Sequence, residues 1–135
     1  MTRTILYIED DPGNIQMVER LLTRRPDTRM LVGRTASDGV AVAASERPDL
    51  ILLDNHLPDG TGSEVLQRLA ATAATEAIPV VIISGDAPPA APPAEPPGAA
   101  HLGPAPAGYL GKPFRLRDFL DMIDRYLPAT APDGS

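Results

Sequence analysis

Three short, uninterrupted apolar runs most constrain how this chain can fold. They are Ile5–Ile8, Leu50–Leu53 and Val80–Ile83. Each run is too short for a helix and lacks the alternation of a strand with one solvent-facing side, so it is typical of a strand buried on both faces. Two weaker candidates, Arg29–Gly33 and Tyr109–Gly111, bring the predicted strands to five.

Helical patterns lie between these strands. Apolar residues recur at helical spacing in three segments. They are Ile15, Val18, Leu21 and Leu22 in the first, Val65, Leu66 and Leu69 in the second, and Leu116, Phe119, Leu120, Ile123 and Leu127 in the third. Residues 37–46 fill the remaining place, with Ser37 expected as the N-cap. This alternation predicts parallel strands joined by right-handed crossovers, and therefore a doubly wound α/β sheet.

Residues 87–107 break the alternation, because they hold eight of the chain's sixteen prolines. A proline inside a helix removes a backbone hydrogen bond and costs about 3 kcal/mol, so we expect a polyproline II segment or mobile loop in place of a helix. The spacing of the proline pairs also fits a docking site for a proline-reading domain, but an unstructured insertion is the preferred interpretation. We expect one domain over residues 1–127 and a flexible tail over 128–135.

Composition excludes several classes of protein. The chain has no cysteine, which rules out disulfides, thiolate metal sites and cysteine nucleophiles. No apolar run approaches the ~20 residues of a membrane span, and Met1–Thr4 does not resemble the start of a signal peptide. A net charge of −6 argues against direct binding of nucleic acid, which needs clustered Lys and Arg. We therefore expect a cytoplasmic protein that binds neither membranes nor nucleic acids.

Polar residues follow the predicted strands where each strand ends. They are Glu9, Asp10 and Asp11 after the first strand, Asp54 after the third, Ser84 after the fourth, and Lys112, the only lysine, after the fifth. The carboxyl ends of parallel strands meet at one edge of the sheet, where such folds bind ligands. Carboxylates from two strands suit Mg²⁺, and a carboxylate beside a cation can attack a phosphoryl group. The pattern favours phosphoryl transfer to a carboxylate, with Mg²⁺ as cofactor.

Each of these residues also has a plain structural interpretation. Asp11 stands before a proline, as expected of an N-cap followed by the first helical residue. Asp54 could be a solvated strand end, Ser84 a turn residue and Lys112 simply the end of a strand. The two histidines lack the spacing of a metal pair and are expected to be ordinary loop residues. The order of the polar residues along the chain nevertheless favours a site over coincidence.

Five segments carry a resemblance to a known family. They read Ile-Leu-Tyr-Ile-Glu-Asp-Asp at 5–11, Pro-Asp-Leu-Ile-Leu-Leu-Asp at 48–54, Leu-Pro-Asp-Gly-Thr-Gly at 57–62, Ile-Pro-Val-Val-Ile-Ile-Ser-Gly at 78–85 and Gly-Tyr-Leu-Gly-Lys-Pro-Phe at 108–114. Over residues 3–127 the chain resembles the CheY-like receiver domains of bacterial two-component response regulators. The resemblance implies a flavodoxin-like five-stranded sheet of order 2-1-3-4-5.

The resemblance also implies an acceptor and a metal site. A histidine kinase or histidine phosphotransfer protein would donate its phosphoryl group to Asp54 in a phosphorelay. The implied Mg²⁺ ligands are Glu9, Asp10, Asp54 and the backbone carbonyl of His56. Asp10 is favoured as the direct ligand within the acidic pair.

Further residues match those that stabilise the phosphoryl group and transmit the signal. Ser84 and Lys112 would contact the phosphoryl oxygens, and Ser84 and Tyr109 would change conformation on phosphorylation. His56 and Asp86 fall at positions that tune the lifetime of the acyl phosphate in this family. The resemblance therefore implies a complete phosphoacceptor site.

The Pro-rich segment departs from the family, whose members carry a helix between the fourth and fifth strands. That helix normally forms part of the surface used for dimerisation or effector docking, so this surface is expected to differ here. We expect a single-domain regulator that signals to a protein effector and is no enzyme beyond Mg²⁺-dependent self-phosphorylation and autodephosphorylation. Two alternatives stay open: a phosphorylation-independent receiver-like binding module, and a Mg²⁺-dependent phosphatase or phosphotransferase. The second lacks an acid two residues after Asp54.

Overall fold

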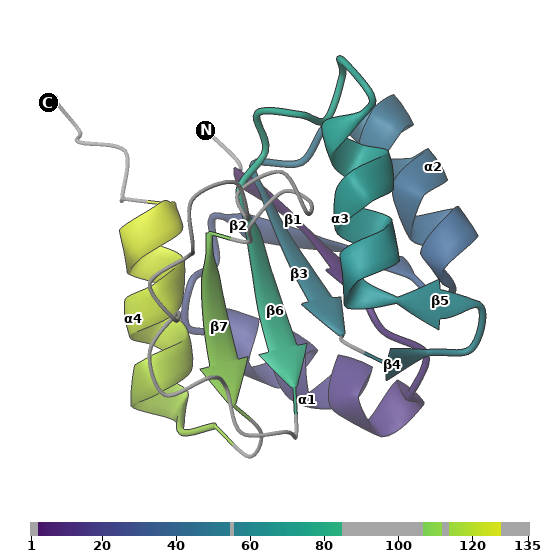
Figure 1. The fold of residues 1–135 in the computed structure, drawn as a ribbon. Helices are drawn as coiled ribbons and strands as arrows, with labels where there is room; N and C mark the ends of the chain where they lie inside the picture. The colour runs from purple at the N-terminus through teal and green to yellow at the C-terminus, as the bar shows by residue number, and fades with distance from the viewer. Residues whose placement is uncertain (1–2, 55, 85–106, 112–113, 128–135) are drawn as a thin grey trace, which may run out of the picture.

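A parallel β-sheet of five strands forms the centre of the computed structural model (Figure 1). The structure describes residues 3–54, 56–84, 107–111 and 114–127. The strands of this sheet are β1 (Arg3–Ile8), β2 (Thr28–Gly33), β3 (Leu50–Asp54), β6 (Val80–Ser84) and β7 (Gly108–Gly111). They lie in the order β2-β1-β3-β6-β7, and all neighbours are parallel. The doubly wound fold class is confirmed, and this order corresponds to 2-1-3-4-5 when the five strands are counted along the chain.

The central strands owe their positions to the apolar runs of the sequence. The runs Ile5–Ile8 in β1 and Leu50–Leu53 in β3 are fully buried. Successive side chains point to opposite faces of a sheet, so Tyr7 joins the core on one face and its neighbour Ile8 joins the core on the other. These strands contribute to both cores, which explains why their sequences show no polar alternation.

Helices cover both faces of the sheet. They are α1 (Pro12–Leu22), α2 (Ala36–Glu46), α3 (Gly62–Ala70) and α4 (Leu116–Tyr126). The helices α1 and α4 pack on one face, and α2 and α3 on the other (Figure 1). Each predicted helical pattern falls in one of them. Within the described part of the chain, no helix has both the length and the apolar character needed to cross a membrane.

The start of α2 differs from the prediction. Thr35, and not Ser37, is the N-cap: its backbone is extended and its side chain accepts a hydrogen bond from the Asp38 N–H at 3.0 Å. Ser37 lies in the first turn of the helix instead. The prediction was wrong because Ser and Thr are both good caps. The choice between them depends on where the backbone leaves its extended conformation after β2.

A short antiparallel hairpin follows β3 and was not predicted. It consists of β4 (His56–Leu57) and β5 (Gly60–Thr61). Thr61 then caps α3 through a capping box, in which Glu64 donates its backbone N–H to the Thr61 hydroxyl and accepts the Thr61 N–H. Two-residue strands are too short to leave a pattern in the sequence, so only the folded chain reveals them.

The expected Pro-rich crossover over residues 87–107 lies outside the described residues except for Ala107. The predicted tail over residues 128–135 lies outside them entirely. Ala107 donates its backbone N–H to the Val80 carbonyl at 2.7 Å and so starts the pairing of β7 with β6. The predicted domain boundaries remain predictions.

Candidate functional site

An acidic cluster lies at the carboxyl ends of the two central strands, β1 and β3. Glu9 and Asp10 follow β1 directly, and Asp54 is the last residue of β3. One carboxylate oxygen from each of these residues lies within 4.8 Å of the others. Glu9 is 1% exposed and Asp54 6%, whereas Asp10 is exposed. The sheet therefore brings Asp54 beside the adjacent pair Glu9 and Asp10, as an oxygen-only set that could hold a hard divalent cation.

Among the described residues, Tyr7, Asn14 and Asp11 donate hydrogen bonds to Glu9 in this cluster. The Tyr7 hydroxyl donates to Glu9 Oε1 at 2.9 Å, and the Asn14 side-chain amide donates to the same oxygen at 3.2 Å. The backbone N–H of Asp11 donates to Glu9 Oε2 at 3.3 Å. Burial first, and then the Glu9 carboxylate, raise the pKa of the Tyr7 phenol above its ordinary value. The Tyr7 hydroxyl therefore keeps its proton and acts as the donor in this bond.

Sequence analysis identified neither Tyr7 nor Asn14 as part of the site. Tyr7 is the one aromatic residue in the first apolar run, and that was its only signal. Asp11 takes the structural role expected of it, because its carboxylate accepts the Asn14 N–H at 3.1 Å as the N-cap of α1. The turn between β1 and α1 thus supplies both the N-cap of the helix and a hydrogen-bond donor to the Glu9 carboxylate.

The remaining predicted residues fall at the same edge of the sheet where their backbone is described. Ser84 is the last residue of β6 and pairs in register with Gly111 of β7. The residue before it in β6, Ile83, pairs with Asp54 of β3. The side chains of Ser84 and His56, together with all of Lys112 and Asp86, lie outside the described residues. The backbone of His56 opens β4, two positions after Asp54 in the sequence. Figure 1 shows the strand ends and this hairpin at one edge of the molecule.

The hairpin is fastened to α2 by a residue that sequence analysis did not single out. Asp59 accepts hydrogen bonds from the backbone N–H groups of Ala36 at 2.6 Å and Ser37 at 3.1 Å, in the first turn of α2. These backbone donors lower the pKa of the Asp59 carboxyl. Asp59 appeared in the sequence only within the segment 57–62 that carries the family resemblance, which does not indicate its distant partner. Asp59 thereby helps to fix the segment that follows Asp54.

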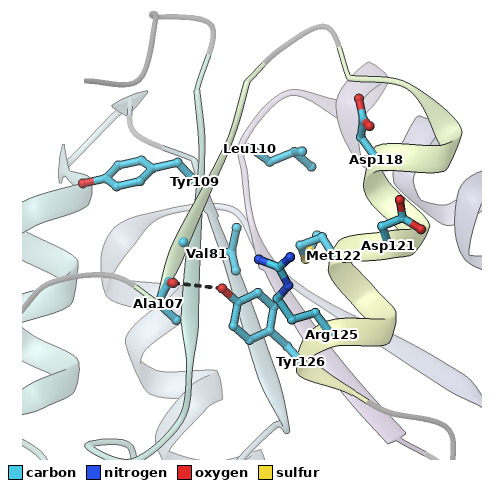
Figure 2. Close-up of a pocket in the computed structure, with 10 residues that line it drawn as sticks. Val81, Ala107, Tyr109, Leu110, Asp118, Asp121, Met122, Arg125 and Tyr126 are labelled. Atoms are coloured by element: carbon cyan, nitrogen blue, oxygen red, sulfur yellow. Dashed lines mark hydrogen bonds between the residues drawn. The ribbon is translucent and has the colours of Figure 1, made fainter. Parts of the chain in front are cut away.

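Tyr109, the predicted switch residue, is 51% exposed on β7. It pairs in register with Ile82, whose side chain belongs to the core on the α2 and α3 face. Figure 2 shows Tyr109 directed away from α4, while Leu110 points toward that helix. On the α4 side of β7, Tyr126 donates its hydroxyl to the Ala107 carbonyl at 2.8 Å beside a shallow pocket (Figure 2). This pocket is separate from the acidic cluster.

Comparison with known proteins agrees with this geometry. The family described as response regulator receiver domain matches residues 5–124. The chain belongs to this family. Membership accounts for the parallel sheet, and it identifies the chain as a member of a two-component signalling family.

Two curated receiver proteins show how far this similarity extends. PilH from Pseudomonas aeruginosa is 32% identical over 80 residues, which are 59% of this chain and 65% of PilH. The KDP operon transcriptional regulatory protein KdpE from Escherichia coli is 31% identical over 133 residues, which are 96% of this chain and 55% of KdpE. This receiver chain therefore spans less than two thirds of the length of either relative.

Solved receiver structures share the fold. The chemotaxis protein CheY4 of Vibrio cholerae superposes with a TM-score of 0.77 at 22% identity, over 94% of this chain and 100% of that one. The receiver domain of the sensor histidine kinase PA1611 from Pseudomonas aeruginosa gives a TM-score of 0.74 at 24% identity, over 93% of this chain and 98% of that one. That domain holds a magnesium ion in its active-site cleft.

Proposed function

We propose that this receiver accepts a phosphoryl group on Asp54 from a histidine kinase or a histidine phosphotransfer protein. The observation that carries the proposal is the gathering of Glu9, Asp10 and Asp54 within 4.8 Å at the carboxyl edge of the sheet. Asp54 is one of the two buried members and stands at the end of β3, so its carboxylate has a fixed position in the cluster. A positioned carboxylate among oxygen ligands is what phosphoryl transfer to an aspartate requires.

The cofactor of the proposed site is Mg²⁺. Its ligands would be the carboxylates of Glu9, Asp10 and Asp54 and the backbone carbonyl of His56, with Asp10 as the direct ligand within the acidic pair. When bound, Mg²⁺ neutralises charge on the phosphoryl oxygens. The all-oxygen donor set and the burial of two of its members support this assignment.

The proposed chemical step is a displacement at phosphorus. An Asp54 carboxylate oxygen forms a bond to phosphorus as the bond to the donor's histidine nitrogen breaks, and the imidazole leaves with the bonding pair. Ser84 donates its hydroxyl and Lys112 its ammonium group to the phosphoryl oxygens, which stabilises the charge that they carry. In this proposal Asp54 therefore becomes an acyl phosphate, and its later hydrolysis resets the site.

The signal then passes to a protein partner. Ser84 and Tyr109 change conformation on phosphorylation, and the exposure of Tyr109 leaves room for such a change. His56 and Asp86 tune the lifetime of the acyl phosphate. We propose that the chain acts in the cytoplasm, that it contacts an effector protein, and that it binds no nucleic acid or membrane.

The decisive experiment is intact-mass spectrometry after incubation with phosphoramidate, with and without Mg²⁺. The wild type should gain the mass of one phosphoryl group only when Mg²⁺ is present, and Asp54→Asn should gain none. Asp49→Asn is a matched control, because Asp49 precedes the same strand at its opposite end and accepts the Thr4 N–H at 2.8 Å. This control should gain the phosphoryl group as the wild type does.

Two results would contradict the proposal. Equal labelling of Asp54→Asn and the wild type would move the acceptor to another residue. A folded wild type that takes no label from phosphoramidate or from a phosphorylated histidine phosphotransfer protein would support the alternative, a phosphorylation-independent receiver-like binding module.

A further inference from the structure

A phenol lies in the interior of β1, next to the acidic cluster. Tyr7 is fully buried, and its hydroxyl donates to Glu9 Oε1 at 2.9 Å in a buried hydrogen bond. The other residues of its run, Ile5, Leu6 and Ile8, carry no polar side-chain atom that could make such a contact. The ring of Tyr7 packs in the core on the α1 and α4 face, so the aromatic body is held by packing and the hydroxyl is aimed at one carboxylate oxygen.

A second side chain reaches the same oxygen from another element. Asn14, in the first turns of α1, donates its side-chain amide to Glu9 Oε1 at 3.2 Å. The Asp11 N–H contacts the other oxygen, Oε2, at 3.3 Å. Because Glu9 is 1% exposed, bulk water cannot replace a donor that is removed. The orientation of the Glu9 carboxylate therefore depends on these neighbours.

We propose that Tyr7 and Asn14 are positioning residues, which hold the Glu9 carboxylate in the orientation that the acidic cluster needs to bind a divalent cation. The inference rests on the proposed function, in which this cluster binds Mg²⁺. Groups that hydrogen-bond to a ligating carboxylate restrict its orientation before the ion arrives, and their loss lowers metal affinity about 10- to 100-fold. Since each of the two donors supplies part of this restraint, loss of either one should weaken Mg²⁺ binding about tenfold.

The test is isothermal titration of the full chain with MgCl₂. Tyr7→Phe removes the hydroxyl and keeps the ring that fills the core, so the fold should survive and Mg²⁺ affinity should fall about tenfold. Tyr126→Phe is the matched control. It also removes one tyrosine hydroxyl, whose bond to the Ala107 carbonyl lies outside the acidic cluster, and it should leave Mg²⁺ affinity unchanged.

A double-mutant cycle separates positioning from a general structural effect. If Tyr7 acts through Glu9, then Tyr7→Phe should change Mg²⁺ affinity less than about twofold once Glu9 has been replaced in Glu9→Gln. Phosphorylation by phosphoramidate gives a second readout. The Mg²⁺ concentration for half-maximal rate should rise about tenfold in Tyr7→Phe, while the rate at saturating Mg²⁺ stays near that of the wild type.

Asn14→Ala provides an independent variant, because Asn14 is half-buried and its removal leaves the core intact. It should also weaken Mg²⁺ binding about tenfold. The inference is overturned if the wild type binds Mg²⁺ and both folded variants bind it equally well. A folded wild type that binds no Mg²⁺ would instead overturn the metal site of the proposed function, and this inference with it.

Discussion

A buried charged residue lies at each end of strand β1: Arg3 is its first residue, and Glu9 follows its last. The charged neighbours of these two residues differ. At the amino end, the Arg3 guanidinium lies 3.2 Å from Asp27 and donates to the Leu127 carbonyl just after α4. At the carboxyl end, Glu9 lies with Asp10 and Asp54, which carry charge of the same sign. The first end pairs opposite charges and links the end of α4 to the sheet. The second end gathers like charges, which suits a site for a cation.

This difference between the two ends of β1 indicates that the buried charge of Arg3 contributes to stability and that of Glu9 to function. The two terminal nitrogens of the Arg3 guanidinium have an opposite charge and a carbonyl as partners, whereas its buried Nε has no hydrogen-bond partner among the described residues. Like charges held together cost free energy, and a bound cation recovers that cost. Changes at the Arg3 end should therefore alter the free energy of unfolding without altering Mg²⁺ binding, and changes at the Glu9 end should alter Mg²⁺ binding.

The largest expected effect is the loss of stability when the contacts of the Arg3 guanidinium are removed. Arg3→Met should lower the free energy of unfolding by about 2 kcal/mol, because it removes charged hydrogen bonds from a buried position. Urea unfolding monitored by circular dichroism measures this. Arg25→Met is the matched control, since Arg25 also pairs with an aspartate, Asp124, at 2.7 Å, but in a more exposed place. It should cost less than about 1 kcal/mol. Equal losses in the two variants would contradict the comparison.

The next prediction concerns stabilisation by Mg²⁺ binding at the Glu9 end of β1. At a Mg²⁺ concentration of about ten times the dissociation constant, binding should raise the free energy of unfolding by about 1.4 kcal/mol. Asp10→Asn should lose this increase, and Arg3→Met should keep it. Asp11→Asn is the matched control, because Asn caps a helix as well as Asp does, and it should also keep the increase. Urea unfolding with Mg²⁺, and then with the ion removed by EDTA, measures each case.

The smallest effect concerns the pH dependence of the hairpin anchor. Backbone donors lower the pKa of Asp59 in the folded state, so its contribution to stability is present above the ordinary aspartate pKa of about 3.9 and is lost as pH falls through the lower folded value. Asp59→Asn should be slightly less stable than the wild type at pH 7, and the difference should disappear in strong acid. Thermal unfolding from pH 7 to pH 2 measures it. A difference that grows on acidification would contradict the sign of the shift.

Residues that contribute through local patterns were predicted well. The apolar runs indicated the strands of the main sheet. Helical spacing located α1, α3 and α4, and the remaining place between two strands located α2. The acidic residues were predicted to meet because parallel strands bring their carboxyl ends together. The N-cap of α2 was wrong by two residues, and the short hairpin of β4 and β5 was missed, because both depend on backbone conformation within a few residues.

Residues that act through distant partners were not predicted. Nothing in the sequence pairs Arg3 with the carbonyl of Leu127, or Asp59 with the first turn of α2, because these contacts join positions far apart in the chain. From the sequence, Tyr7 was predicted only to be a buried residue of a strand. Its contact with Glu9 depends on the exact direction of both side chains, which the core around β1 sets.

The sequence by itself thus determined the alternation of strands and helices, the edge of the sheet where polar residues collect, and the family to which the chain is similar. These follow from hydrophobic periodicity and short motifs, which are local properties. Only the tertiary structure decided that Arg3 meets Asp27 at one end of β1 and that Glu9 meets Asp10 and Asp54 at the other. That distinction depends on distances between side chains from different elements, and those distances exist only once the sheet has formed.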